Sequence, residues 1–118
     1  MKTLVIGASS NKERYSYKAI QNLVHKNHQV VAIGSKKDKV FDISIASEKI
    51  DFLGVDTVTL YINATVQKDY YDYIIALHPR RVIFNPGTEN PDFYLLLKKN
   101  NILYEIACTL VLLATNQY

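Results

Sequence analysis

Small and polar residues follow the short apolar runs of this chain at five points. The first is Gly7-Ala8-Ser9-Ser10-Asn11, which comes directly after Leu4-Val5-Ile6 and shortly before a helical pattern. A strand, a glycine turn and a helix N-terminus form a common cradle for a phosphorylated nucleotide, because backbone N–H groups there point at the anion. Gly7 is the only glycine of this turn, so the full G-x-G-x-x-G pattern is absent. The turn predicts a nucleotide-type ligand without identifying it.

The other four points have a similar composition. They are Gly34-Ser35-Lys36-Lys37, Asn63-Ala64-Thr65, Asn85-Pro86-Gly87-Thr88 and Ala107-Cys108-Thr109. Backbone N–H groups and hydroxyls suit an anion, and the scarcity of carboxylates argues against a hydrolytic centre. Arg14 and Tyr15 stand just beyond the first turn. A guanidinium forks onto phosphate oxygens, so these two side chains could close over a pyrophosphate. An exposed charge at a helix start is the alternative.

The second point discriminates best between nucleotides. Enzymes that use NAD usually place Asp or Glu at the end of the second strand to hold the ribose hydroxyls. This chain has Gly34-Ser35-Lys36-Lys37 there. Lysine beside a ribose fits a phosphorylated ribose, as in a dinucleotide with a 2′-phosphate or in coenzyme A with its 3′-phosphate. A solvated turn is the alternative.

The chain offers no clear catalytic or metal-binding group. Ser9 and Ser10 have no obvious base partner and could instead cap the following helix. Cys108 is the only cysteine and precedes the last helical segment; it is a candidate binding residue, with a buried structural thiol as the alternative. We therefore predict neither a catalytic residue nor a metal site.

Length and composition predict one domain over residues 1–118. The net charge of +3 is mild, and the basic residues are dispersed, which argues against nucleic-acid binding. No apolar run is long enough to span a bilayer, no signal peptide is evident, and a single cysteine suits a reducing cytoplasm. Nine tyrosines leave a homodimer possible, because tyrosine is enriched in interface cores.

Strand and helix patterns alternate along the chain. Strands are expected over 3–6, 29–34, 55–62, 81–84 and 102–106, with a possible short edge strand over 39–45. Helices are expected over 15–27, 66–77 and 109–115, and another begins after Asn90 as N-cap with Pro91 in first position. This order predicts a single Rossmann-like α/β domain: a doubly wound, mainly parallel five-stranded sheet with helices on both faces. Ligands of such sheets bind at the carboxyl ends of the strands, where the five polar points lie.

The first turn, the following Arg14-Tyr15-Ser16-Tyr17 and the later Asn85-Pro86-Gly87-Thr88-Glu89-Asn90-Pro91 together resemble the small CoA-binding domain family. This Rossmann-like domain also occurs in the alpha subunit of succinyl-CoA synthetase. The resemblance runs nearly end to end. It implies a cytoplasmic, usually non-catalytic module that holds coenzyme A through its diphosphate and adenosine.

The resemblance also assigns positions. Gly7, Ala8 and Ser9 match the diphosphate turn, and Arg14 matches the basic position beyond it. Gly34, Ser35 and Lys36 lie near the expected adenosine, where the family usually has Asn-Pro, and Gly87 matches a later glycine. The chain departs from the family pattern at Gly34-Ser35, Asp42, Ile62 and Asn85-Pro86.

Three functions remain open on the sequence alone. The first is binding of coenzyme A or an acyl-CoA, without catalysis. The second is an NADP-type dinucleotide-binding domain of a reductase, although no residues remain for a substrate domain. The third is an interaction domain for an unidentified protein partner that keeps the fold without a ligand.

Overall fold

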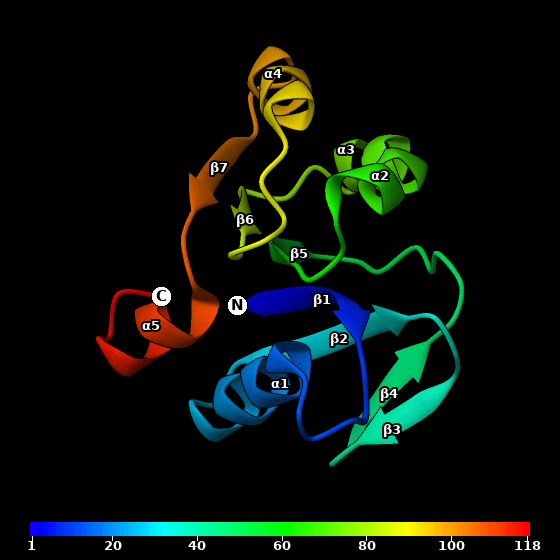
Figure 1. Cartoon of the computed structure of the whole chain (residues 1–118), viewed down its shortest axis with the longest axis vertical. Coiled ribbons are helices and arrows are strands. Elements are labelled where there is room, and N and C mark those ends of the chain that lie inside the picture. The colour runs from blue at the N-terminus through cyan, green and yellow to red at the C-terminus, as the bar shows by residue number, and fades with distance from the viewer.

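The computed structural model describes residues 1–118, which form one sheet between two layers of helices (Figure 1). The strands are β1 (Lys2–Ala8), β2 (Gln29–Gly34), β3 (Asp38–Val40), β4 (Ile43–Ala46), β5 (Val55–Leu60), β6 (Arg81–Phe84) and β7 (Leu103–Ile106). The helical segments are α1 (Tyr15–His25), α2 (Ala64–Gln67), the 3-10 turn η1 (Lys68–Tyr70), α3 (Tyr71–Leu77), α4 (Pro91–Lys99) and α5 (Thr109–Ala114).

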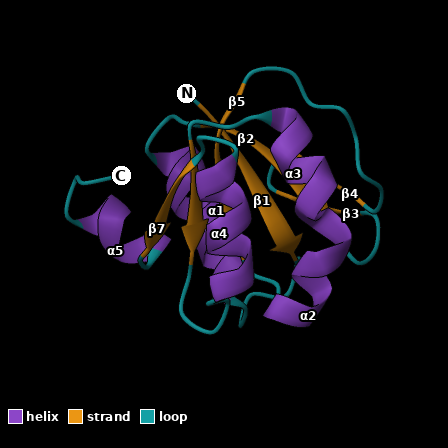
Figure 2. Cartoon of the chain, turned by 90° about the horizontal axis from the view of Figure 1, so that it is seen from above, coloured by secondary structure: helices purple, strands orange, loops and turns teal.

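The strand order is β3-β4-β2-β1-β5-β6-β7, and only the β3–β4 pair is antiparallel. The arrowheads of β1 and β7 accordingly point the same way in Figure 2. From the central β1 the chain passes first to β2 on one side and later to β5 on the other. This reversal places the topological switch point at the carboxyl end of β1, where ligands of such sheets bind.

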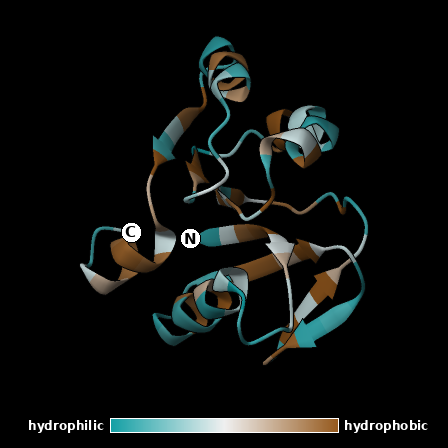
Figure 3. Cartoon of the chain, in the orientation of Figure 1, coloured by the Kyte–Doolittle hydropathy of each residue, from teal (hydrophilic) through white to brown (hydrophobic).

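Each face of the sheet has its own core. Ile20 of α1 and Leu113 of α5 pack with Val5 on one face, while Phe93 of α4 packs with Leu4 on the other. Neighbouring residues of β1 therefore serve opposite cores, which explains why the strand is apolar without alternation. In Figure 3 the hydrophobic colour is concentrated in the central strands and β3 is hydrophilic. The predicted α/β class with helices on both faces is confirmed.

The predicted number of five strands is wrong, because the sheet has seven. The possible edge strand over 39–45 is instead the hairpin of β3 and β4, which turns at Phe41 and Asp42. Phe41 has a φ of +54°, in the left-handed region that bulky residues rarely adopt. Hairpin turns usually contain Asn-Gly or a similar pair, so this turn carries no recognisable sequence signal.

Two other boundaries differ from expectation. The helix expected over 66–77 is divided into α2, η1 and α3. The strand expected over 55–62 ends at Leu60, so Tyr61 and Ile62 belong to the rim of the sheet. The N-cap prediction is confirmed, since the Asn90 side chain accepts a hydrogen bond from the Phe93 N–H at 3.3 Å and Pro91 opens α4.

No helix combines the length and apolar character needed to cross a bilayer.

Candidate ligand-binding site

Gly7 shapes the carboxyl end of β1. Its φ is +93°, and a Cβ there would lie 2.7 Å from the Tyr61 carbonyl oxygen. The Tyr61 N–H donates to the Ile6 carbonyl at 2.8 Å, which binds the end of β5 closely to β1. Only glycine combines this backbone conformation with so close a neighbour. Gly7 thereby fixes the position from which the Tyr61 side chain projects.

A cavity of about 350 Å³ opens over this glycine, and we call it the polar pocket. It lies among the ends of β1, β5 and β6 and the start of α1. Its lining residues are Gly7, Arg14, Tyr15, Ser16, Tyr61, Ile62, Asn63, Pro86, Gly87 and Thr88. The arrangement brings together predicted site residues from four separate parts of the chain.

Arg14 is the only cationic residue that lines the polar pocket. It is the N-cap residue of α1 but makes no side-chain capping bond there. Its side chain is exposed and forms no ion pair. The guanidinium is therefore free to meet an anion.

Two other groups of the polar pocket already have partners. The Asn63 side chain accepts a hydrogen bond from the Val66 N–H at 3.0 Å and so caps α2. The Gly87 N–H donates to the Glu89 carboxylate at 2.8 Å. An anion that used the Gly87 N–H would therefore have to displace this exposed carboxylate.

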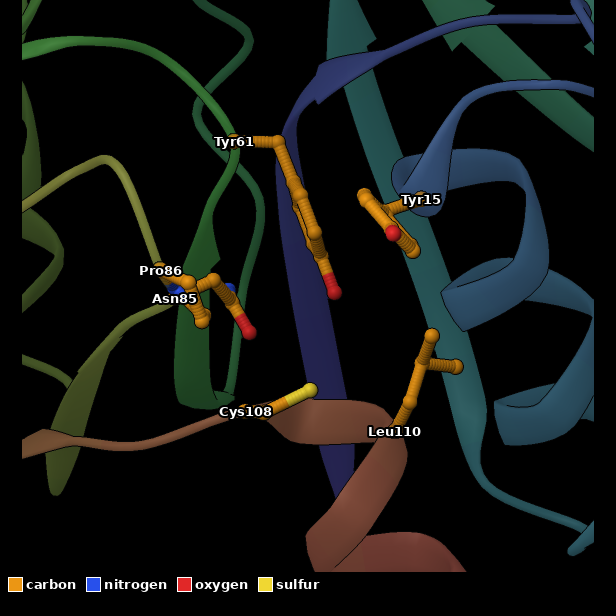
Figure 4. A pocket seen from close by; sticks show the side chains of 6 residues that line it. All are labelled: Tyr15, Tyr61, Asn85, Pro86, Cys108 and Leu110. Carbon is orange, nitrogen blue, oxygen red and sulfur yellow. The ribbon is translucent and has the colours of Figure 1, made fainter.

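A second cavity of about 230 Å³ adjoins the polar pocket, and we call it the tyrosine pocket. It is lined by Tyr15, Tyr61, Asn85, Pro86, Cys108 and Leu110. The two cavities share Tyr15, Tyr61 and Pro86. Figure 4 shows the two tyrosine side chains on adjacent sides of the pocket and the Cys108 sulfur directed into it. None of the six lining residues carries a charge.

Asn85 ties the wall of the tyrosine pocket to three elements. Its Nδ2 donates to the Thr59 hydroxyl at 2.6 Å and to the Leu60 carbonyl at 2.9 Å. Its Oδ1 accepts from the Thr109 N–H at 2.8 Å, at the start of α5. The hydroxyls of Thr59 and Thr109 complete the network at 2.8 Å. Because Asn85 is only 2% exposed, it acts as a rigid junction between β5, β6 and α5.

Tyr61 presents an unsatisfied hydroxyl to the same pocket. The oxygen is buried and has no hydrogen-bond partner, although the Thr59 and Thr109 hydroxyls lie nearby. Burial raises the pKa of Tyr61 to about 12, and the nearby threonine hydroxyls oppose this only in part. At neutral pH the group is therefore protonated and able to donate. An unpaired buried donor is unusual and favours a bound acceptor.

The remaining predicted site residues do not line either pocket. The Ser9 hydroxyl accepts from the Asn11 N–H at 3.0 Å, and Ser10 donates to the Asp38 carboxylate. Neither serine caps α1. Ala8 is buried, and a Cβ on Gly34 would lie 2.4 Å from the Ala8 carbonyl oxygen. Gly34 therefore allows the ends of β1 and β2 to pack closely.

The predicted lysine pair lies at the other side of the switch point. Ser35, Lys36 and Lys37 are exposed beyond β2, and Lys37 lines a separate cavity of about 360 Å³ beside β4. Asp38 lines the same cavity. The Ser10 hydroxyl, and more weakly the charge of Lys36, lower the pKa of Asp38. This part of the rim therefore contains a carboxylate that the residues directly after β2 do not reveal.

Sequence reasoning missed several residues that line the two pockets. They are Ser16, Tyr61, Ile62 and Leu110, whereas Thr88 belongs to the predicted rim segment Asn85-Pro86-Gly87-Thr88. The continuous β-prone run from Val55 to Ile62 predicts Tyr61 and Ile62 inside a strand, whereas β5 ends at Leu60. A rule that treats the last residues of each β-prone run as rim positions would have found both.

Comparison with protein families identifies the family of the chain. The model of a CoA binding domain matches residues 1–114. The chain belongs to this CoA-binding domain family.

Solved structures agree with the fold of the family. A crystal structure of an uncharacterized protein has 44% sequence identity and a TM-score of 0.96, over 99% of this chain and 97% of the other. The protein ID.343 from Thermus thermophilus has 17% identity and a TM-score of 0.86, over 99% and 90%. A hypothetical protein from Pyrococcus horikoshii has 18% identity and a TM-score of 0.83, over 92% and 78%. No significant match is found among functionally curated proteins.

Proposed function

We propose that this chain binds coenzyme A, or an acyl-CoA, and catalyses no reaction of its own. The observation that carries the proposal is the pair of adjoining cavities at the switch point, which share Tyr15, Tyr61 and Pro86. One contains the free guanidinium of Arg14, and the other is lined by residues without charge. Coenzyme A likewise has a charged part and an uncharged part, because its diphosphate is anionic and its pantetheine arm is uncharged.

The diphosphate is assigned to the polar pocket. Arg14 supplies a planar fork of donors that matches phosphate oxygens. Gly87 lines the same pocket, and its N–H becomes available to an anion once the Glu89 carboxylate moves away. The pantetheine arm then extends past Tyr61 into the tyrosine pocket.

The 3′-phosphoadenosine is assigned to the end of β2, beside Gly34 and Ser35. Lys36 and Lys37 offer the only cluster of positive charge on that part of the rim. Asp38 stands next to them and reduces their attraction for a phosphate. We therefore expect the 3′-phosphate to add a modest part of the affinity.

The state of the polar side chains supports binding without catalysis. The hydroxyls of Ser9 and Ser10 take part in local hydrogen bonds, and Asn85 is fully bonded. Cys108 is a free thiol, which suits a reducing compartment such as the cytoplasm. An NADP-type ligand, or no ligand, remains as an outcome of the test below.

Thermal denaturation of the purified protein with CoA, dephospho-CoA, NADP and NAD separates these functions. A ligand at a hundred times its dissociation constant stabilises the folded state by about 2.7 kcal/mol. For a domain of this size the melting temperature should rise by roughly ten degrees. We expect CoA to give the largest shift and dephospho-CoA a smaller one. No shift with CoA would refute the proposal, and a larger shift with NADP would support the reductase alternative.

A pair of double variants tests the adenosine assignment. Lys36→Ala with Lys37→Ala should make CoA and dephospho-CoA equal in affinity. Lys98→Ala with Lys99→Ala removes the same charge from the last turn of α4 and should preserve the difference. An unchanged difference in the first variant would show that the 3′-phosphate is held elsewhere.

A further inference from the structure

The tyrosine pocket has three features that a free thiol does not use. Its lining is uncharged, its volume is about 230 Å³, and the Tyr61 hydroxyl directed at it is buried without a partner. A thiol sulfur is only a weak hydrogen-bond acceptor, so the thiol end of free coenzyme A would leave this hydroxyl unsatisfied. A carbonyl oxygen is a strong acceptor and would satisfy it.

We infer that the tyrosine pocket selects short, uncharged acyl thioesters over the free thiol and over acyl groups that carry a carboxylate. The Tyr61 hydroxyl donates to the thioester carbonyl, and the alkyl group lies against Leu110 and Pro86. This inference rests on the proposed function, since it names the preferred form of the same ligand.

The charge of the site explains why a carboxylated acyl group is excluded. Arg14 lines the polar pocket but not the tyrosine pocket, and no other cation lines the latter. The amide of Asn85 cannot turn toward a carboxylate without losing its bonds to Thr59, Leu60 and the Thr109 N–H. A carboxylate in this pocket would therefore be desolvated without a compensating partner.

The apolar wall explains why the alkyl length matters. Leu110, Pro86 and the rings of Tyr15 and Tyr61 form most of the lining (Figure 4). Burial of one methylene group strengthens binding by about fourfold. The gain should end when the cavity is filled. Tyr15 is 67% exposed, so its ring stands at the mouth of the pocket, where a ligand can displace it.

The test measures dissociation constants by calorimetry for CoA and for its acetyl, propionyl, butyryl and succinyl thioesters, together with S-butyl-CoA. We expect the affinity to rise from CoA to butyryl-CoA by at least about tenfold. Succinyl-CoA should bind at least about tenfold more weakly than butyryl-CoA, which has the same number of acyl carbons. S-butyl-CoA retains the alkyl group without the carbonyl and should bind about fivefold more weakly than butyryl-CoA.

Two tyrosine variants isolate the hydroxyl. Tyr61→Phe should make the affinities for butyryl-CoA and S-butyl-CoA equal. It should also fold normally, because the hydroxyl that it removes has no partner in the ligand-free chain. The matched control Tyr17→Phe alters a residue of α1 that lines neither pocket, and it should change none of the ratios.

The outcomes separate this inference from the proposed function. If CoA binds but the acyl thioesters bind no better, or succinyl-CoA equals butyryl-CoA, the inference is overturned and the proposed function stands. A preserved difference between butyryl-CoA and S-butyl-CoA in Tyr61→Phe also overturns the role of the hydroxyl. If no CoA compound binds, the proposed function and the inference both fall.

Discussion

The polar pocket and the tyrosine pocket share three residues but hold their polar groups differently. In the polar pocket, Arg14 is exposed and unpaired, and the Gly87 N–H is occupied only by the exposed carboxylate of Glu89. In the tyrosine pocket, Asn85 is buried and makes three hydrogen bonds. Binding in the polar pocket should therefore depend on charges that solvent and salt screen. Binding in the tyrosine pocket should depend on the shape of a rigid, uncharged wall.

This difference indicates how substitutions should act. Changes to the rigid wall should reduce the free energy of unfolding, because the wall also joins β5, β6 and α5. Changes to the exposed side chains of the polar pocket should leave folding intact and alter only the affinity for anions.

The largest effect is expected from Asn85→Leu. This change removes three hydrogen bonds and leaves the Thr109 N–H and the Leu60 carbonyl buried without partners. Each unsatisfied buried group costs about 1–3 kcal/mol, so the free energy of unfolding should fall by about 3 kcal/mol. Urea denaturation measures this loss.

A matched change at Asn22, which is exposed on α1, serves as the control. Asn22→Leu should alter the free energy of unfolding by less than about 0.5 kcal/mol. If the two variants were equally stable, the description of Asn85 as a structural junction would be wrong.

Gly7→Ala should have the next largest effect, and it should affect both pockets because it displaces Tyr61, which lines both. The new Cβ would meet the Tyr61 carbonyl at 2.7 Å, and the φ of +93° is strained for alanine. Backbone strain of this kind costs about 1–3 kcal/mol, and the displaced Tyr61 backbone adds to it. The unfolding free energy and the affinity for CoA should both decrease.

Gly54→Ala separates strain from crowding. Gly54 also has a positive φ, of +69°, but a Cβ there would meet nothing within 4 Å. This variant should lose stability through strain alone and retain its affinity for CoA. Equal losses of affinity in both variants would contradict the role of Gly7 in placing Tyr61.

These two glycines also show what the sequence can and cannot predict. Gly7 is predicted as a site residue because it ends an apolar run, and the same rule predicts Asn63, Asn85 and Cys108 at the rim. The alternation of strands and helices then predicted the fold class. The rule does not explain why this position requires glycine. The requirement comes from the close approach of the Tyr61 carbonyl, which depends on the pairing of two strands more than fifty residues apart in the sequence.

Local patterns failed where tertiary contacts decide the structure. The hairpin of β3 and β4 turns at Phe41 in a left-handed conformation, which no local preference favours. Asp38 at its start reaches Ser10 of the first turn, so a carboxylate lies beside a loop that appeared to have none. Such contacts between distant segments leave no signal in the spacing of residues.

Arg14→Ala should leave stability nearly unchanged and weaken binding of CoA by about tenfold. The side chain is exposed and has no partner in the chain, so its loss costs the fold little. A charge-assisted contact with phosphate contributes about 1.5–3 kcal/mol before screening. The slope of affinity against salt concentration should also decrease, as calorimetry at several ionic strengths would reveal. An unchanged salt dependence would place the diphosphate away from Arg14.

The smallest effect, and one of opposite sign, is expected from Glu89→Gln. Its carboxylate accepts the Gly87 N–H at 2.8 Å and stands where a ligand anion would compete for the same donor. Glutamine keeps an acceptor for this bond but removes the like charge, and an exposed charge interaction is worth up to about 1 kcal/mol. We therefore expect CoA to bind a few times more tightly, with the gain largest at low salt. The control Glu13→Gln removes a charge outside both pockets and should give no gain in affinity. Weaker binding of CoA by Glu89→Gln would mean that the carboxylate positions Gly87 and does not compete with the ligand.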